Sequence, residues 1–244
     1  MSLSFASTAL YAGLTDARRT AAKAQVAKRG DVKAEAAYFR AAVAKMKTPE
    51  DFFKNYRALK FAMTAFDMGT QMQYPARLKQ IMMSDPTDPL SLVNRMTDPA
   101  YRTINNSFKL YNGTLDRLQD PTFINKVVEK YTNATYEQGL GDMNPALTDA
   151  LYFERTIGTV KNGYQIISDP ILFRVVKTAN NLPDAVAGGS KVEALKTWVE
   201  KNFSLSKAND AAYVKKYITR YLALSDMKDQ QGANGGNALV GMFA

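Results

Sequence analysis

The protein has 244 residues, of which 46% are hydrophobic, and a formal net charge of +9 from 32 Lys and Arg against 23 Asp and Glu. This is the composition of a globular protein that can bury a substantial core, in one large domain or two small ones. Cysteine and histidine are both absent, which excludes disulfides, thiol nucleophiles, imidazole bases and the usual zinc ligands.

Two kinds of targeting segment are not predicted. No run of eighteen or more apolar residues occurs, so we expect no membrane span. The first residues, Met1–Thr8, lack a basic region leading into a long apolar one, so we expect no secretory signal peptide. The basic excess is concentrated in residues 1–33 and 196–221, which we interpret as solvated helix faces that could also attract acidic partners.

The N-terminal segment, residues 1–30, is predicted to be mobile or helical. Its first thirteen residues are small and polar with scattered apolar groups, which is typical of a terminus that is mobile until it packs. From Leu14 to Arg29 the chain consists mainly of good helix formers and carries five basic side chains. We interpret this stretch as an exposed cationic helix, with contact to an acidic surface as the alternative.

The chain contains two copies of one pattern, at residues 35–68 and 149–182. Without a gap, a shift of 114 positions superposes six identical residues of the first copy: Ala36, Tyr38, Phe39, Lys47, Thr64 and Ala65. It also keeps apolar class at Val43/Ile157, Met46/Val160, Phe52/Ile166, Phe53/Ile167, Leu59/Phe173, Ala62/Val176 and Met68/Leu182. We interpret this as a duplicated helix-loop-helix unit; two unrelated helical hairpins could produce much of the apolar correspondence.

Proline pairs mark expected helix starts. A Thr, Asp or Asn followed by Pro places a capping side chain before a residue whose missing amide hydrogen the first helical turn does not need. Such pairs occur at Thr48-Pro49, Asp88-Pro89, Asp98-Pro99, Asp120-Pro121, Asn144-Pro145 and Asp169-Pro170. Asp85, Asp88 and Asp98 are therefore predicted to be mostly caps rather than a carboxylate metal site.

Apolar residues recur at three- and four-residue steps, as in Phe123, Val127 and Tyr131, and sustained strand-type alternation is lacking. We therefore predict an all-α protein with about nine to eleven helices, a multi-helix array built from the duplicated unit. The glycine-rich break at residues 139–145 separates a first helical repeat at 31–141 from a second at 142–225. Residues 226–244 are predicted to be a flexible tail, whose apolar end at 238–244 either docks or frays.

No motif predicts catalysis or cofactor binding. The glycine pairs lack the strand and lysine of a phosphate-binding loop. Glu50, Asp51 and Glu154 could form acid and base pairs, but Glu50 and Asp51 suit a first helical turn, and Glu154-Arg155 suits a structural charge pair. The 13 Tyr and 12 Phe occupy apolar helix positions, which favours a core over base stacking. We predict no enzyme activity, no catalytic, metal or cofactor-binding residues, and no nucleic-acid partner.

Several segments resemble a domain of unknown function that is common in alphaproteobacteria. The similarity spans about residues 31–224 and is carried by segments such as Ala37–Phe39, Thr48–Phe53, Ala58–Met68 and Ala150–Arg155. Members of that family are often encoded within or beside flagellar gene clusters, so the resemblance implies a motility setting and brings no established site residues. The chain departs from the family pattern at Asp67-Met68, where Gly-Leu is usual, and at Asn180-Asn181, where Leu-Gly is usual.

These observations lead to two functional hypotheses beside the enzyme alternative. The first is a non-enzymatic flagellar structural component or assembly factor, cytoplasmic or exported through the flagellar apparatus, with residues 14–29 and 238–244 as candidate contact segments. The second is a cytoplasmic chaperone or regulator that binds a partner helix in an apolar groove between the repeats. An enzyme would need a conserved polar cleft. In the first two cases the partners are other proteins.

Overall fold

The computed structural model describes the backbone of residues 7–240 and the side chains of residues 7–228. All regular elements in this range are helical, which confirms the predicted all-α class. None of the described helices is long and apolar enough to cross a membrane.

The α-helices in chain order are α1 (Ser7–Gly13), α2 (Asp16–Lys28), α3 (Gly30–Val43), α4 (Pro49–Lys54), α5 (Tyr56–Ala65), α6 (Pro75–Met82), α7 (Leu92–Arg95), α8 (Pro99–Phe108), α9 (Asp116–Gln119), α10 (Pro121–Met143), α11 (Pro145–Thr156), α12 (Gly163–Ser168), α13 (Pro170–Ala179), α14 (Asp184–Gly189), α15 (Val192–Asn202) and α16 (Ala211–Val240). Four 3₁₀ helices join them: η1 (Gly69–Gln73), η2 (Leu110–Asn112), η3 (Ile157–Thr159) and η4 (Leu205–Lys207).

The number of helices exceeds the nine to eleven predicted. Residues 7–240 form 16 α-helices, of which 11 are long. The remaining helices, α4, α7, α9, α12 and α14, have six residues or fewer. Capping residues divide the chain more often than the apolar spacing alone indicates: α4, α9 and α12 each end at the residue that caps the next helix, Asn55, Asp120 and Asp169.

The proline pairs begin helices with one exception. The side chains of Asp98, Asn144 and Asp169 each accept a hydrogen bond from a backbone amide of the first turn that follows. The prediction for Asp88-Pro89 is wrong, because the Asp88 carboxylate accepts from the amide of Leu90 in a turn and no helix starts there.

The chain forms two compact units, each with its own hydrophobic core. One unit is Asp16–Gln138, and the other combines the N-terminal residues up to Thr15 with residues 139 onward. The boundary falls inside α10, a few residues before the predicted end of the first repeat at residue 141. Residues 16–30, which include α2, belong to the first of these units, while α1 belongs to the second.

The core of the 16–138 unit is rich in stacked aromatic rings. Phe61 of α5 stacks between Phe39 of α3, at a ring-centroid distance of 4.6 Å, and Tyr131 of α10, at 4.0 Å. A second cluster is formed by Phe52 and Phe108, which stack at 5.6 Å. These contacts join α3, α5 and α10 into one packed group.

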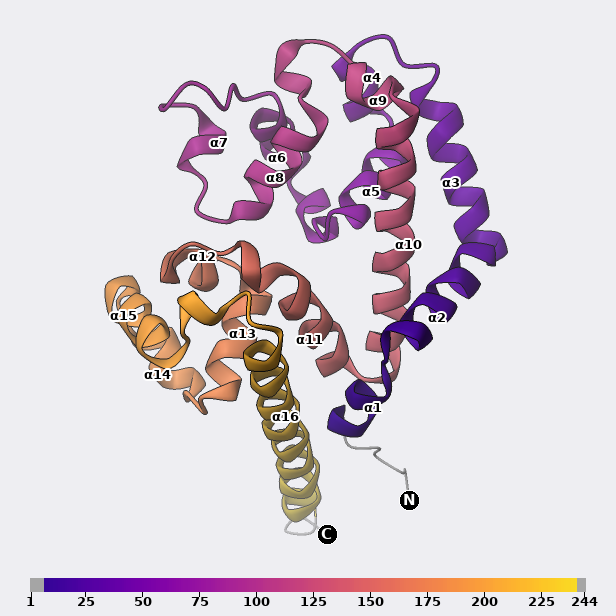
Figure 1. The fold of residues 1–244 in the computed structure, drawn as a ribbon. Coiled ribbons are helices and arrows are strands. Elements are labelled where there is room, and N and C mark those ends of the chain that lie inside the picture. The colour runs from indigo at the N-terminus through magenta and orange to yellow at the C-terminus, as the bar shows by residue number, and fades with distance from the viewer. Residues whose placement is uncertain (1–6, 241–244) are drawn as a thin grey trace. The chain divides into compact units, whose positions relative to one another are not determined.

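In the other unit α16 packs along α13 and α11 (Figure 1). Tyr217 of α16 stacks on Phe153 of α11 at 5.8 Å. Helix α1 packs against α11 and α16 and contributes Tyr11, only 4% exposed, to this core. The amide and hydroxyl of Ser7 both donate to Asp226, which joins the N-terminal helix to α16.

The duplicated unit is present as three helices in each copy. Helices α3, α4 and α5 of the first copy correspond to α11, α12 and α13, and a shift of 114 carries the bounds of α4 and α5 onto those of α12 and α13. Hydrogen bonds recur at the same positions: Tyr38 donates to Asn55 as Tyr152 donates to Asp169. This supports the predicted duplication beyond apolar class alone.

Two terminal predictions fall partly on described residues. Helix α16 continues to Val240, so the segment predicted as a tail from residue 226 begins within a helix. Residues 1–6 and 241–244, which include the end of the predicted apolar terminus, lie outside the described residues. The predicted cationic helix at residues 14–29 corresponds to α2, which has no buried residue.

Candidate functional site

The carboxylates considered as acid and base candidates are used in local structure. Asp51 accepts hydrogen bonds from the amides of Lys47 and Thr48, and these bonds hold the pKa of its carboxyl below the usual value. Glu50 forms an ion pair with Lys79 of α6 at 2.9 Å. Both residues lie in the first turn of α4, as predicted.

The three aspartates predicted to be caps each bind backbone amides. Asp85 accepts from the amide and hydroxyl of Thr87, while Asp88 and Asp98 accept from amides two residues later. Across the part of the chain that the structure describes, no group of three acidic side chains is placed to hold a metal ion.

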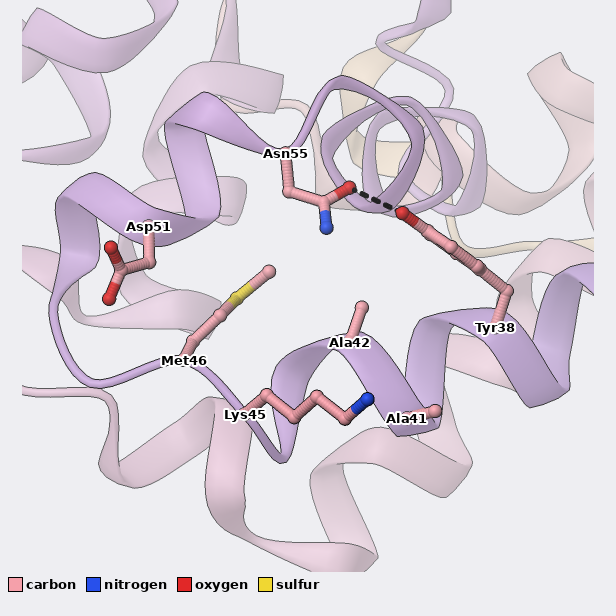
Figure 2. A pocket seen from close by; sticks show the side chains of 7 residues that line it. All are labelled: Tyr38, Ala41, Ala42, Lys45, Met46, Asp51 and Asn55. Atoms are coloured by element: carbon pink, nitrogen blue, oxygen red, sulfur yellow. Dashed lines mark hydrogen bonds between the residues drawn. The ribbon is translucent and has the colours of Figure 1, made fainter.

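The first copy of the duplicated unit carries several open pockets, of which two are described in turn. The first, the Tyr38 pocket, has a volume of about 380 Å³ and lies between α3 and α4 (Figure 2). Its floor is apolar and its rim is polar, and the Tyr38 hydroxyl donates to the Asn55 side chain across one end at 3.2 Å. It is lined by Tyr38, Ala41, Ala42, Lys45, Met46, Asp51 and Asn55.

The second, the Tyr131 pocket, has a volume of about 480 Å³ and lies between α3, α5 and α10. Its base is the stacked pair Phe61 and Tyr131, and charged side chains of both signs surround it. Burial raises the pKa of the Tyr131 hydroxyl, so this group stays protonated at neutral pH. The pocket is lined by Asp31, Glu35, Tyr56, Arg57, Lys60, Phe61, Thr64 and Tyr131.

Arg57 connects the two pockets. Its guanidinium lies over the ring of Tyr38, 4.0 Å from the centroid. It also donates to both carboxylate oxygens of Glu35, at 3.0 and 3.1 Å, and this bonding raises the pKa of Arg57. A planar cation held by a carboxylate and an aromatic face at once is fixed in orientation, which a lysine at this position would not be.

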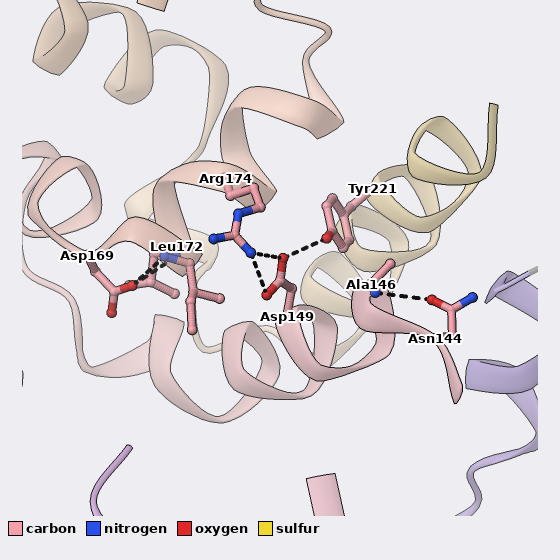
Figure 3. A network of polar contacts seen from close by, with 8 residues as sticks. Asn144, Ala146, Asp149, Asp169, Leu172, Arg174 and Tyr221 are labelled. Atoms are coloured by element: carbon pink, nitrogen blue, oxygen red, sulfur yellow. Dashed lines mark hydrogen bonds and ion pairs between the residues drawn. The ribbon is translucent and has the colours of Figure 1, made fainter. Parts of the chain in front are cut away.

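In the second copy the counterparts of Glu35, Lys60 and Tyr131 bind one another in a polar network (Figure 3). Asp149, the counterpart of Glu35, is 7% exposed. It accepts from Arg174 of α13 at 2.9 Å and from the Tyr221 hydroxyl of α16 at 2.9 Å. Tyr221 lies 90 positions after Tyr131, as Val214 and Ile218 lie 90 positions after Ile124 and Val128. The two networks are therefore built from corresponding residues.

The two copies also differ at a residue that lines the Tyr38 pocket. Ala41 lines that pocket, and its counterpart in the second copy is Arg155. The guanidinium of Arg155 lies over the ring of Tyr152, the counterpart of Tyr38, at 4.9 Å. Together with Glu154, Arg155 lines a separate pocket of about 330 Å³ beside α16. The two copies thus differ at this position, an alanine in the first and an arginine in the second.

Comparison with known proteins identifies a family. The family described as Protein of unknown function (DUF1217) matches residues 65–214, more than half of the chain. The chain belongs to this family. The DUF1217 match contains the whole second copy but begins at Ala65, the last residue of α5, so the residues that line both open pockets lie before it except Tyr131.

A solved structure shares the DUF1217 protein's fold. It is the X-ray crystal structure of protein AGR_C_984 from Agrobacterium tumefaciens, an alphaproteobacterium. The TM-score is 0.78 over 93% of this chain and 97% of that chain, at 23% sequence identity. At this identity the comparison establishes a common fold. No curated protein matches the sequence.

Sequence reasoning named no site residues and missed the two pockets. The corresponding pairs Glu35/Asp149 and Lys60/Arg174 can be found in the sequence at the shift of 114. The sequence does not indicate, however, that Glu35 binds Arg57 rather than Lys60. Tyr131 could be linked to the copies only through the separate shift of 90. The cluster depends on a long-range contact between α5 and α10.

Proposed function

We propose that this DUF1217 protein is a non-enzymatic, protein-binding component of the flagellar system, either a structural component or an assembly factor. The motility setting rests on the family resemblance of its sequence. The binding role rests on the open pockets of the first copy of the duplicated unit, where Lys60 lacks the acidic partner that its counterpart Arg174 has in the second copy.

The observation that carries the binding role is the composition of the open surface. Tyr38, Tyr56 and Arg57 line a further pocket, which shares Tyr38 with the Tyr38 pocket and Tyr56 and Arg57 with the Tyr131 pocket, and Tyr56 is 63% exposed. Tyrosine and arginine are enriched among the residues that dominate binding energy at protein interfaces. Arg57 is already fixed by Glu35 and Tyr38, so a partner would lose little side-chain entropy in contacting it.

The same surface is compatible with a second function, a cytoplasmic chaperone or regulator that binds a partner helix. A partner helix commonly binds by inserting apolar side chains into a groove or pocket between helices. The two functions differ in where the protein is found and in what accompanies it, and not in which residues make contact.

Cell fractionation separates the two functions. A chain tagged at its C-terminus would be followed in cytosol, culture medium and sheared flagella, in cells with and without a working flagellar export apparatus. Export-dependent appearance in sheared flagella is expected for a structural component. Retention in the cytosol of both strains, together with a co-purified client, would instead support the chaperone or regulator.

A photo-crosslinking experiment tests the binding surface itself. A photoreactive phenylalanine analogue would replace Tyr56, and in a matched control Tyr74, which is 53% exposed on the same unit but lies outside the pockets. We expect a discrete crosslinked protein in living cells from position 56 and none from position 74. Equal yields from the two positions would contradict the assignment of the surface.

A further inference from the structure

We propose that the Tyr131 pocket binds a carboxylate that stands next to an apolar group, with Lys60 as its cationic partner. The source is an acidic segment of the polypeptide partner, so this inference rests on the proposed function. It is drawn from the difference between the two copies of the duplicated unit.

The acids of the pocket already have cationic partners. Asp31 is paired with Arg29 at 2.6 Å, and Glu35 receives two hydrogen bonds from Arg57. The side chain of Lys60, by contrast, makes no hydrogen bond or ion pair with any residue that the structure describes. The lining therefore carries one cation without a partner, which would bind an anion and repel a cation.

Comparison with the second copy explains why Lys60 has no partner. Its counterpart Arg174 binds Asp149, which lies 25 residues before it. In the first copy the acid is bound by Arg57, only 22 residues after Glu35 and about one helical turn before Lys60. Arg57 thus forms the ion pair with Glu35, and the Lys60 ammonium remains available to bind another ligand.

The floor of the pocket determines which anion fits. Phe61 is 2% exposed and stacks on Tyr131, so the base is aromatic. The Tyr131 hydroxyl stays protonated and adds no negative charge. A volume of about 480 Å³ is within the range of ligand sites, roughly 300–1,000 Å³. A lining that holds one unpaired cation and an aromatic base suits an aspartate or glutamate flanked by an apolar residue, whereas a phosphate would call for several donors.

The net charge supports this choice of partner. At +9 the protein attracts acidic segments at long range, and such attraction mainly raises the association rate. Lys60 then contributes at short range, where its ammonium meets the carboxylate beside the apolar base. A partner with a basic contact segment would be disfavoured by the same field.

The test uses the full chain and two pairs of probes. The first pair is the peptide acetyl-Glu-Phe-Glu-amide and its Gln-Phe-Gln analogue, and the second is phenylacetate and phenylacetamide. Binding would be measured by chemical-shift titration of the isotope-labelled protein. We expect the acidic peptide to bind at least ten times more tightly than its neutral analogue, with the largest shifts at Lys60, Phe61 and Tyr131.

Variants at one position decide the role of the ammonium. Lys60→Met should weaken the acidic peptide about tenfold, while Lys60→Arg retains binding. Lys33→Met is the control, because Lys33 lies on α3 of the same unit, is exposed and does not line the pocket. Circular dichroism would verify that each variant keeps its helix content.

Three results would overturn the inference: equal binding of acidic and neutral peptides, unchanged binding by Lys60→Met, or binding of phenylacetate without binding of either peptide. The last result would make the pocket a small-molecule site. Because these titrations use purified protein and defined peptides, they are independent of the fractionation that tests the flagellar setting. A charge-dependent site in a protein found to be neither exported nor bound to a client would leave only the proposed function refuted.

Discussion

Tyr38 and Tyr152 occupy corresponding positions but make different hydrogen bonds. Tyr152 donates at 2.6 Å to the carboxylate of Asp169, which is 3% exposed, whereas Tyr38 donates at 3.2 Å to the neutral amide of Asn55. A hydrogen bond to a buried charged group contributes roughly 1.5–3 kcal/mol to stability, and one between neutral groups about 0.5–1.5 kcal/mol. We expect Tyr152→Phe to lower the free energy of unfolding more than Tyr38→Phe does.

Urea unfolding of both variants, followed by circular dichroism, measures this difference. The two substitutions remove the same hydroxyl from matched positions, so each serves as the other's control for the loss of the phenol oxygen. A larger decrease in the free energy of unfolding for Tyr38→Phe would contradict this expectation. It would mean that the Asp169 carboxylate accepts a hydrogen bond from another donor once the Tyr152 hydroxyl is removed.

The buried tyrosines of α16 predict a loss of stability at high pH. Burial, with Asp149 as a second cause, raises the pKa of the Tyr221 hydroxyl above its ordinary value of about 10. Above pH 10 the unfolded chain releases this proton while the folded protein keeps it, so the unfolded state binds fewer protons and stability falls. The slope is about 1.4 kcal/mol per pH unit for each such tyrosine.

Tyr221→Phe isolates this contribution. Below pH 10 the variant is expected to be less stable than the wild type, because it lacks the hydrogen bond to Asp149. Between pH 10 and 11.5 the difference should shrink by about 1.4 kcal/mol per pH unit. Urea midpoints at half-unit steps would test it, and parallel curves for the two proteins would contradict the assignment to Tyr221.

At the scale of the element, the third helix of each copy ends in the same way. Asp67 and Asn181, at corresponding positions after α5 and α13, have φ values of 59° and 53°. The next residues, Met68 and Leu182, return hydrogen bonds to carbonyls five positions earlier, and their side chains are buried. This is a Schellman motif, in which glycine is the preferred left-handed residue. Both departures from the glycines that the family resemblance implies thus fall on left-handed positions, where glycine would be unstrained.

We expect glycine to be favoured over alanine at both positions by about 1 kcal/mol. A left-handed backbone costs roughly 1–2 kcal/mol in a residue that carries a Cβ atom, and glycine lacks that cost. Comparing Asp67→Gly with Asp67→Ala, and Asn181→Gly with Asn181→Ala, removes the polar side chain in both members of each pair. If thermal unfolding ranked alanine equal to glycine, the cap would not depend on backbone conformation.

The elements that the sequence predicts well are those set by local chemistry. The caps at Asp98, Asn144 and Asp169 follow from the residue types alone, and the duplication follows from apolar spacing at a fixed shift. Pocket opening depends on contacts between distant helices, such as that of Tyr131 with Phe61, and on which of Arg57 and Lys60 binds the acid. Local pattern carries no information on either choice, so the site could not be predicted.

At the scale of the whole molecule, the first and last described helices, α1 and α16, pack together in one unit. Helix α1 belongs with residues 139 onward although α2 belongs with residues 16–138. The sequence of residues 1–13 predicts mobility until packed, and the packing partner is too distant in the chain to be read from local pattern. In the structure Ser7 binds Asp226 and also accepts from the Asn144 amide at 2.7 Å.

We therefore expect deletion of residues 1–15 to destabilise one unit and leave the other unchanged. The deletion removes the buried Tyr11 from the core shared with α11 and α16, and burial of one such side chain contributes about 2 kcal/mol. Amide hydrogen exchange in α11 and α16 should then become roughly thirty times faster, since 1.4 kcal/mol corresponds to a factor of ten. Exchange in α3 and α5 is the internal reference.

Tyr11→Ala provides a milder version of the same change, and deletion of residues 1–6 alone is the control for shortening the chain. Faster exchange in α3 and α5 as well would show that the loss of stability spreads beyond the unit to which α1 belongs.

The outcome also bears on the N-terminus as an export segment. Suppose that deletion of residues 1–15 destabilises α11 and α16. A chain lacking residues 1–30 could then lose export either because its structure is damaged or because an export signal is missing. Deletion of residues 1–6 is then the sharper test of export.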